Sequence, residues 1–352
     1  MARYSSNNDE PEKSNAVHEP LPRGSIPHPL LTRYRQEVEK RLSEIYSTDS
    51  WISAAANEAI RAGGKRLRPL LAVLVCEAIC GNPEPAFPAA LAYELAHAAS
   101  LIQDDIIDES AVRHATPTAY KRYGLARAIM LSDSMIFEIF ALMARYRDTQ
   151  LPKAGLAKLL ELLGRAASLA AEGEMLEVAL SRRGDIKTEE YTKVIGQKTG
   201  ALFAASAASG AVVAGADKAL VDKMYEFGLS LGVAFQIGDD ILDMKGNTLN
   251  TGKPVFKDIE NNAGNVVLLH ALSHADVLQK NAISSLLFKK WFTSLEAEKL
   301  LGLLKDLGSF EYAYSLLGEQ ATFCRTLLQS LPPSHARNAL EELTRSVEVR
   351  KE

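Results

Sequence analysis

The sequence predicts an all-α fold, and three observations support this prediction. From residue 29 onward, apolar side chains recur every three or four positions, which is the period of an amphipathic helix. Alternating runs of β-branched residues, which are typical of exposed strands, are nearly absent. The breaks between the periodic segments are short and rich in glycine, proline and polar residues. We therefore expect a single helical bundle of about ten or more helices over residues 29–352.

Long periodic segments mark the main helices in chain order. They cover residues 34–46, 68–80, 89–108, 128–146, 155–180 and 221–244. The second of them can begin at Pro69, because the missing N–H of proline costs nothing in the first turn of a helix. The chain breaks at residues 81–88, 182–190, 214–219, 245–254 and 331–334. None of these breaks has the character of a domain linker.

The composition is that of a globular protein. The 352 residues are 47% hydrophobic and 24% charged, which is ample for a large core. The formal net charge is only -4 and the pI is about 6.1, so no overall basic field attracts nucleic acid. Residues 1–28 are polar and proline-rich, and we expect a flexible tail and not a secretory signal. Because no stretch offers about 18 uninterrupted apolar residues, no membrane span is expected.

The three cysteines, Cys76, Cys80 and Cys324, cannot all pair with one another. Cys76 and Cys80 lie one turn apart in an apolar helical segment, and one interpretation of that spacing is a metal or redox site. We expect buried free thiols instead, which fit a reducing compartment. The predicted location is therefore the cytoplasm.

The segment LIQDDIIDES, residues 101–110, puts three aspartates into an apolar run. At about 100° per helical residue, Asp104 and Asp108 share one face and Asp105 is turned away from it. Like charges on one helix face repel each other. A solvated acidic face is the plain alternative, but the isoleucines between the acids predict a half-buried wall. We therefore expect a cation between the carboxylates.

A second acidic run, QIGDDILD at residues 236–243, has the same DDxxD spacing. Asp239 and Asp243 share a face, and Asp240 is turned away from it. If the two helices face each other across a cavity, the carboxylates of both runs converge on it. All-oxygen ligands favour hard cations, and Mg²⁺ usually keeps waters and binds substrate phosphate oxygens as well. The two runs together predict several Mg²⁺ ions that bridge a diphosphate.

Residues that could hold phosphates occur elsewhere in the chain. GGKRLRP, residues 63–69, carries Lys65, Arg66 and Arg68 beside a Gly-Gly pair at the start of a helix. A basic surface turn is the alternative interpretation of this segment. His97 lies near the face of the first acidic run, where it is either a core histidine or a phosphate donor. The remaining candidates are Lys198 and Thr199 on an alanine-rich helix and Lys253 in a loop.

In their order along the chain, these motifs resemble those of the trans-isoprenyl diphosphate synthases, also called polyprenyl synthetases. The matching segments are GGKRLRP, ELAHAASLIQDDIIDES, the Lys-Thr pair at 198–199, FQIGDDILD, GKP at 252–254, FEYA near 310 and LPPSHARNAL near 331. The resemblance implies an all-α bundle around a deep central cavity, of the isoprenoid synthase type and usually homodimeric. It also implies head-to-tail condensation of an allylic diphosphate with isopentenyl diphosphate.

The resemblance assigns roles to particular residues. The ligands of Mg²⁺ would be Asp104, Asp108, Asp239 and Asp243, supported by Asp105 and Asp240. The allylic diphosphate would be held by Arg113, Lys198 and Lys253. Isopentenyl diphosphate would be held by Lys65, Arg68, His97 and His114. Two residues would lie near the charge that develops during the reaction, Thr199 and Gln236.

Several positions depart from the family pattern. His114 and Ala115 stand where the family has an arginine and a glycine, and a neutral histidine cannot replace a permanent bidentate cation. Ala263 stands where a lysine often follows the aspartate at Asp258, and Glu174 replaces a glutamine. These changes leave open a weakly active or non-catalytic subunit of a heteromeric synthase. A class I terpene cyclase is a third reading, although the second acidic run lacks the Asn, Ser/Thr and Glu triad of such enzymes.

The length of the product is expected to depend on residues before the first acidic run. Ala96, Ala99 and Ser100 are small, whereas aromatic residues nearest the aspartates stop chain growth early in this family. Tyr93, about three turns deeper than Asp104, could form the floor of a tunnel. Core packing is the alternative for all four, and in that case the tunnel could be blocked by Met135, Phe137 or Phe140. We expect a product of about twenty to thirty-five carbons.

Overall fold

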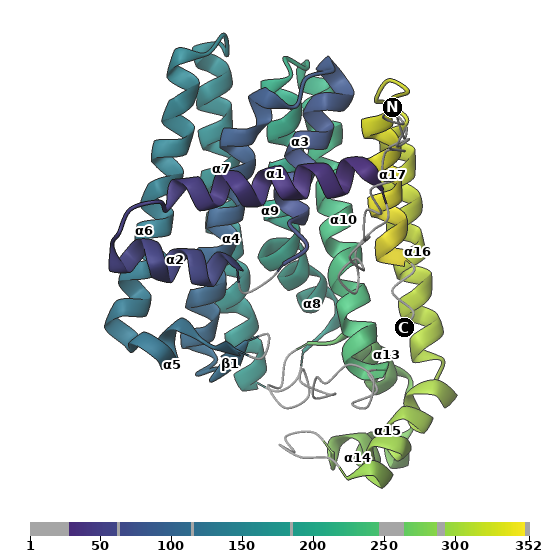
Figure 1. Cartoon of the computed structure of the whole chain (residues 1–352). Helices are drawn as coiled ribbons and strands as arrows, with labels where there is room; N and C mark the ends of the chain where they lie inside the picture. Colours follow the sequence, from purple (N-terminus) through teal and green to yellow (C-terminus); the bar gives the residue numbers. More distant parts are fainter. Residues whose placement is uncertain are drawn as a thin grey trace, which may run out of the picture.

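The computed structural model describes residues 28–61, 64–113, 116–183, 186–245, 264–286 and 293–348, and it is helical almost throughout (Figure 1). Within these ranges the one sheet is an antiparallel hairpin, in which β1 (Val112–Arg113) pairs with β2 (Thr116–Pro117). The predicted all-α fold is therefore confirmed. None of the described helices combines the length and the apolar character that crossing a membrane requires.

The centre of the bundle is α9 (Ala201–Val213), a helix of small residues that is buried on nearly every side. Its neighbours are α3 (Leu67–Cys80), α7 (Lys153–Arg183) and α10 (Lys218–Lys245). On the far side of α3 and α9 lies the pair formed by α4 (Phe87–Ile107) and α6 (Leu125–Ala144). Two helices cross the front of this layer in Figure 1, α1 (Pro29–Ile45) and α2 (Trp51–Arg61).

Glycines bring the central helices close together. A Cβ on Gly210 in α9 would lie 2.4 Å from the carbonyl oxygen of Ala72 in α3. A Cβ on Gly228 in α10 would lie 2.4 Å from the carbonyl oxygen of Phe203 in α9. Because neither side chain could be larger without a backbone shift, these helices pack through their backbones and stay at fixed distances.

The remaining elements cover the ends and the edge of the bundle. The edge beside α10 is formed by α16 (Ser309–Leu328) and α17 (His335–Glu348). The other elements are η1 (Glu84–Ala86), α5 (Ala119–Tyr123), η2 (Arg145–Asp148), α8 (Thr188–Ile195), η3 (Gly196–Gly200), α13 (Val266–His274), α14 (Val277–Ser284) and α15 (Ser294–Asp306).

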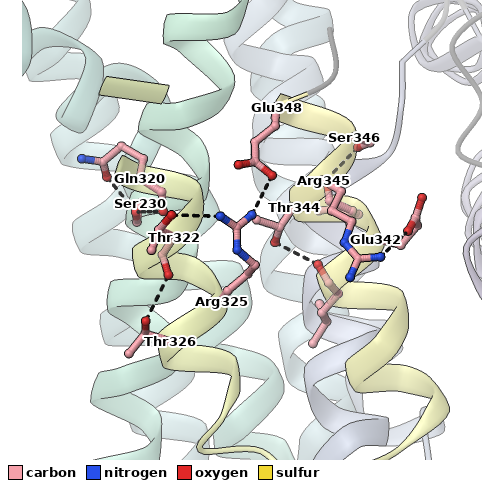
Figure 2. A network of polar contacts seen from close by, with 12 residues as sticks. Ser230, Gln320, Thr322, Arg325, Thr326, Glu342, Thr344, Arg345, Ser346 and Glu348 are labelled. Carbon is pink, nitrogen blue, oxygen red and sulfur yellow. Dashed lines mark hydrogen bonds and ion pairs between the residues drawn. The ribbon is translucent and has the colours of Figure 1, made fainter. Parts of the chain in front are cut away.

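Ion pairs and hydrogen bonds join the edge helices to one another and to α10 (Figure 2). Arg325 of α16 pairs with Glu348 of α17 at 2.6 Å and also donates to Thr322 Oγ1 at 2.9 Å. Ser230 of α10 donates to the side chain of Gln320 at 2.7 Å. This network closes one side of the bundle, away from the acidic runs.

The first helix begins where the sequence predicts the end of a tail. Residues 1–27 of the predicted tail lie outside the described residues, while His28 caps α1 by accepting a hydrogen bond from the N–H of Leu30 at 3.2 Å. His28 therefore belongs to the folded part of the chain.

The cysteines are free thiols, as predicted, but they are not all buried. Cys76 and Cys324 are buried, whereas Cys80 is exposed because it is the last residue of α3. The sulfur atoms of Cys76 and Cys80 lie 3.8 Å apart, within hydrogen-bond distance, and form no disulfide.

Candidate active site

The first acidic run lies at the C-terminal end of α4, where it faces a cavity. Asp104 is half-buried and lines this cavity, and Asp108 lines it from the position directly after the helix. Asp105 is 5% exposed and accepts a hydrogen bond from Arg113 Nε at 2.8 Å. The run therefore gives two carboxylates to the cavity and uses the third to anchor the hairpin.

The second acidic run, on α10, divides its residues in the same way. Asp239 is half-buried and lines the cavity. Asp240 is 1% exposed and accepts hydrogen bonds from the Tyr191 hydroxyl at 2.6 Å and the Val266 N–H at 2.8 Å. Asp243 is half-buried one turn further along α10 and is not among the residues that line the cavity.

The cavity has a volume of about 590 Å³ and lies between α4, α7, α8, η3 and α10. Its acidic lining residues are Asp104, Asp108, Asp239, Glu174 and Glu177. Its basic lining residues are Arg113, Arg182 and Lys198. The cavity thus has carboxylates on opposite walls and cations between them.

Lys198 and Thr199 lie on η3, which is a single π-helical turn between α8 and α9. Such turns are rare and are frequent at functional sites. The backbone of this turn rests directly on α7, because a Cβ on Gly173 would lie 2.5 Å from the backbone nitrogen of Lys198. A glycine on α7 therefore allows the turn to bring both side chains to the cavity.

Two glutamates on α7 hold the ammonium group of Lys198. Glu174 lies 2.5 Å from Lys198 Nζ, and Glu177 pairs with the same nitrogen. Burial alone would lower the pKa of Lys198, but Glu177, Glu174 and Asp104 outweigh burial and raise it. The lysine is therefore a permanent cation in the cavity wall. Glu174, the residue that departs from the expected glutamine, is thus one of the two carboxylate partners of Lys198.

Thr199 begins a short chain of hydrogen bonds that ends at the second acidic run. Its hydroxyl donates to Gln236 Oε1 at 3.0 Å, and Gln236 Nε2 donates to Asp240 Oδ1 at 3.1 Å. The buried carboxylate of Asp240 thereby fixes the amide of Gln236, which in turn orients the threonine.

Burial raises the pKa of Asp104 to about 7, and the nearby carboxylates of Glu174 and Asp108 act in the same direction. Lys198 and Arg113 oppose this rise. A carboxylate with a raised pKa gains most from a cation placed beside it. The electrostatics around Asp104 therefore favour a cation beside this carboxylate.

The donor set fits a hard divalent metal that is bound together with a ligand. In the described part of the chain, no three acidic, histidine or cysteine residues are already gathered around a single point. Asp104, Asp108 and Asp239 offer only oxygen donors, which suit Mg²⁺, an ion that commonly takes one or two carboxylates and completes its shell with water and phosphate oxygens. The residues thus fit Mg²⁺, which would be held by these aspartates and would supply positive charge beside a bound diphosphate.

Of the predicted isopentenyl diphosphate residues, Lys65, Arg68 and His97 are described, and none of these three lines the cavity. Lys65 is exposed, with its Nζ 5.8 Å from the ring centre of Phe235. The guanidinium of Arg68 lies 4.6 Å over the ring of Phe203, and its Nε has no hydrogen bond. Burial lowers the pKa of Arg68 to about 10, although Glu94 and Asp104 oppose this.

His97 is half-buried on α4, and its pKa is lowered well below the usual value by burial and by the positive charge of Arg68 and Arg113. The ring is therefore neutral at physiological pH and can donate one N–H. Arg66, which the sequence groups with Lys65 and Arg68, is instead buried against Glu94. Four other positions singled out in the sequence, besides Lys253, lie outside the described residues: His114, Ala115, Asp258 and Ala263.

Several residues at the cavity, Glu177, Arg182 and Tyr191 among them, were not singled out in the sequence. Glu177 follows Glu174 by three positions and therefore shares its face of α7, a spacing that could have revealed it. Tyr191 lines the cavity while it bonds to Asp240, and no local pattern marks a tyrosine for this task.

The residues before the first acidic run lie along the inner part of α4. Ala99 is buried, and Ala96 and Ser100 are half-buried. Tyr93 is fully buried, and its hydroxyl lies 2.8 Å from Ser209 Oγ on α9. Of the three residues of the alternative tunnel block, Met135 is fully buried on α6, whereas Phe137 and Phe140 are 69% and 60% exposed.

The chain is similar to known proteins along most of its length. The family described as polyprenyl synthetase matches residues 49–302. The short chain isoprenyl diphosphate synthase of Methanothermobacter thermautotrophicus is 32% identical over 313 residues, which are 88% of this chain and 94% of that protein. The geranylgeranyl diphosphate synthase of Sulfolobus acidocaldarius is 34% identical over 262 residues, or 74% and 79% of the two chains.

The fold also matches solved structures. The crystal structure of geranylgeranyl pyrophosphate synthetase from Pyrococcus horikoshii superposes with a TM-score of 0.83 at 30% identity. The match covers 92% of this chain and 98% of that one. It therefore includes the helices that carry both acidic runs.

Proposed function

Because the chain belongs to the polyprenyl synthetase family and is therefore a prenyltransferase, we propose that it condenses isopentenyl diphosphate with an allylic diphosphate in a Mg²⁺-dependent, head-to-tail reaction. The observation that carries this proposal is the pair of acidic walls, with Asp104 on α4 and Asp239 on α10, across one cavity that also holds Lys198 and Arg113.

In this proposal the allylic diphosphate binds between the acidic walls. Asp104, Asp108 and Asp239 hold Mg²⁺, with Asp243 as a further candidate, and the ions supply charge neutralisation to the leaving diphosphate. Arg113 and Lys198, together with Lys253, hold the phosphate oxygens directly. These contacts gain strength as the C–O bond breaks and negative charge moves to the diphosphate, so they lower the barrier to ionisation.

Isopentenyl diphosphate is proposed to bind at the separate basic group of Lys65, Arg68 and His97, with His114 in place of an arginine. The unpaired Nε of Arg68 and its lowered pKa support an anion here, because a half-buried guanidinium without a carboxylate partner gains from a phosphate. The neutral ring of His97 contributes one donor.

The chemistry requires an allylic cation to be protected from water. Thr199 and Gln236 place fixed dipoles near the ionising carbon, held in position by Asp240. Isopentenyl diphosphate attacks this carbon, and the proton lost afterwards passes to the released diphosphate. Apolar cavity walls exclude water during these steps.

We assign a product of at least twenty carbons, in the range of about twenty to thirty-five. The small side chains of Ala96, Ala99 and Ser100 support this assignment, because they leave α4 without an aromatic barrier near the aspartates. Tyr93, which is fully buried and bonded to Ser209, is the proposed floor.

The proposed assembly is a homodimer formed through α6. This helix exposes apolar side chains that a monomer would leave in water, namely Leu125, Ile129, Met130, Phe137 and Phe140. Such a patch on one face is typical of a protein interface. The free thiols of Cys76 and Cys80, 3.8 Å apart, support a reducing compartment such as the cytoplasm.

The test is to incubate the purified protein alone with Mg²⁺, labelled isopentenyl diphosphate and allylic primers of five, ten, fifteen or twenty carbons. We expect elongated polyprenols after dephosphorylation, which disappear on addition of EDTA and in Asp104→Ala or Asp239→Ala. A folded protein that binds diphosphate but elongates no primer would contradict the proposal and point to the non-catalytic subunit of a heteromeric synthase.

A further inference from the structure

Arg66 stands in the basic segment but lies in a different environment from its neighbours. It is 7% exposed, whereas Lys65 is exposed. Its backbone has φ 53° and ψ 35°, in the left-handed region where glycine is favoured over all other residues. An arginine stays in this region, at a cost in free energy, only where contacts of its side chain compensate for the strain.

The guanidinium of Arg66 joins several helices. Its Nη1 forms an ion pair with Glu94 Oε1 of α4 at 2.6 Å, and both side chains are buried, at 6% and 4% exposure. Its Nη2 donates to the carbonyl oxygen of Ile60 at 2.5 Å. This carbonyl lies in the last turn of α2, where it has no partner within the helix. Its Nε also lies 3.8 Å from Glu39 of α1.

These contacts fix the connection between α2 and α3 at both ends. Ile60 comes just before this connection, and α3 begins at Leu67 directly after Arg66. Lys65 precedes Arg66, and Arg68 follows it by two residues. The position of both cations therefore depends on how the Arg66 side chain is held.

Glu94 connects the same contacts to the opposite side of the site. It precedes His97 by three residues and therefore lies one helical turn away on nearly the same face of α4. A single buried ion pair thus joins the segment that carries Lys65 and Arg68 to the helix that carries His97. Arg113 and Lys198, on β1 and η3, lie outside this set of contacts.

We propose that Arg66 and Glu94 are positioning residues for isopentenyl diphosphate. They set the separation of Lys65 and Arg68 from His97 without touching the substrate. The inference rests on the proposed assignment of those three residues to isopentenyl diphosphate. It predicts that loss of the ion pair weakens binding of isopentenyl diphosphate and not of the allylic diphosphate. A general loss of stability would affect both substrates.

The main test is the double variant Arg66→Met/Glu94→Leu. Replacement of a whole buried ion pair by apolar residues of similar size is often tolerated, whereas removal of one partner leaves an uncompensated buried charge. We expect the double variant to fold and its KM for isopentenyl diphosphate to rise by at least about tenfold. The KM for the allylic diphosphate and kcat at saturation should change less than about threefold.

A conservative variant separates geometry from charge. Glu94→Asp keeps the carboxylate but shortens its reach, so its KM for isopentenyl diphosphate should lie between those of the wild type and the double variant. The matched control is Arg325→Met/Glu348→Leu, which removes another interhelical ion pair of 2.6 Å, between α16 and α17 (Figure 2). This control should leave both KM values unchanged.

Direct titration of isopentenyl diphosphate into each protein without metal or primer gives the same comparison without turnover. We expect binding to be at least about tenfold weaker in the double variant than in the wild type. A folded double variant with wild-type affinity would overturn the inference, as would equal losses for both substrates. A wild-type protein that binds isopentenyl diphosphate but elongates no primer would instead contradict the proposed function, and the titration would still decide the role of Arg66.

Discussion

Asp105 and Asp240, the second aspartates of the two acidic runs, are bound to the protein scaffold and not to the cavity. Asp105 holds Arg113 on the hairpin, and Asp240 accepts hydrogen bonds from Tyr191, Val266 and Gln236. Each DDxxD run therefore supplies a carboxylate to the cavity with its first aspartate, and its second aspartate holds neighbouring elements in place. Substitution of the first aspartate of a run should consequently impair activity, whereas substitution of the second should impair stability.

We predict that Asp239→Asn and Asp240→Asn have different effects. Asp239→Asn should lower kcat/KM by at least about a hundredfold with little change in stability, because it removes an expected metal ligand. Asp240→Asn should lower the free energy of unfolding by about 1–3 kcal/mol, because a neutral amide is a weaker acceptor for its three donors. Urea denaturation together with steady-state kinetics tests both, and equal stability of the two variants would contradict the assignment of Asp240.

A second prediction concerns the pH dependence of stability without metal. The pKa of Asp104 is raised from 3.8 to about 7, so its contribution to stability is full below about pH 4 and is lost as the pH rises through about 7. The Asp104→Asn variant has no ionisable group at this position, so its stability does not fall in this way. From pH 5 to pH 8 the free energy of unfolding should therefore shift in favour of the variant by about 1–2 kcal/mol, with allowance for partial exposure.

Urea denaturation in EDTA at the two pH values measures this shift. Added Mg²⁺ with inorganic diphosphate at pH 8 should raise the stability of the wild type more than that of Asp104→Asn, because the metal neutralises the carboxylate. A difference between the two proteins that stays constant from pH 5 to pH 8 would rule out this explanation.

At the scale of single residues, the sequence predicts correctly which aspartates of a helix face the same way, because helical periodicity controls this. The 100° rotation per residue separates Asp104 from Asp105 and Asp239 from Asp240, as the structure has them. Periodicity cannot say how far along α10 the cavity extends, and Asp243 lies beyond its lining. It also cannot show that Arg66 turns into the core, because Glu94 is a partner from a distant part of the sequence.

Among the described elements, α6 exposes a row of large apolar side chains along one face. Phe137 and Phe140 are 69% and 60% exposed, and Met130 on the same helix is 54% exposed. Phenylalanine loses its favourable burial when it faces water. The length of this face suits association with a second copy of the helix.

We expect Phe137→Glu to convert a dimer into a monomer, because a carboxylate cannot be buried in an apolar interface without a partner. Light scattering coupled to size-exclusion chromatography measures the mass. Phe323→Glu, at a 47% exposed phenylalanine of α16, is the control and should leave the mass unchanged. A wild-type protein that is monomeric at micromolar concentration would refute the proposed interface.

Helix boundaries were less predictable than helix positions. The predicted break at residues 182–190 is shorter in the structure, because α7 runs to Arg183 and α8 begins at Thr188. Charged residues at a helix end look like loop residues in a sequence, although they are exposed helical positions here. The π-helical turn at Gly196–Gly200 has no sequence signature either, since its geometry comes from packing against Gly173.

At the scale of the whole molecule, the proposed function makes product length a consequence of the depth between the aspartates and Tyr93. We expect Tyr93→Ala to shift the products to longer chains, because it removes a fully buried ring from the proposed floor. Chromatography of dephosphorylated products measures this shift. The variant should also lose about 3–5 kcal/mol of stability, so the assay is best run well below the unfolding temperature.

Two control variants distinguish the removal of the proposed floor from a general loosening of the core. Ser209→Ala removes the hydrogen bond to Tyr93 without opening space and should leave product length unchanged. Leu74→Ala destabilises another fully buried site, on α3, and should also leave it unchanged. Longer products from Leu74→Ala as well would show that loosening of the core, and not the floor, controls length.

The π-helical turn of η3 sets a limit on how this chain can change in length. A π turn contains about one residue more than an α turn, so deletion of a single residue would restore a regular helix. Because the deleted residue would be the extra one of the wide turn, α8 would keep its orientation relative to α9 and Tyr191 would stay near Asp240. Loss of one residue between Gly196 and Gly200 should therefore displace Lys198 and Thr199 at the cavity and leave the packing of α8 unchanged.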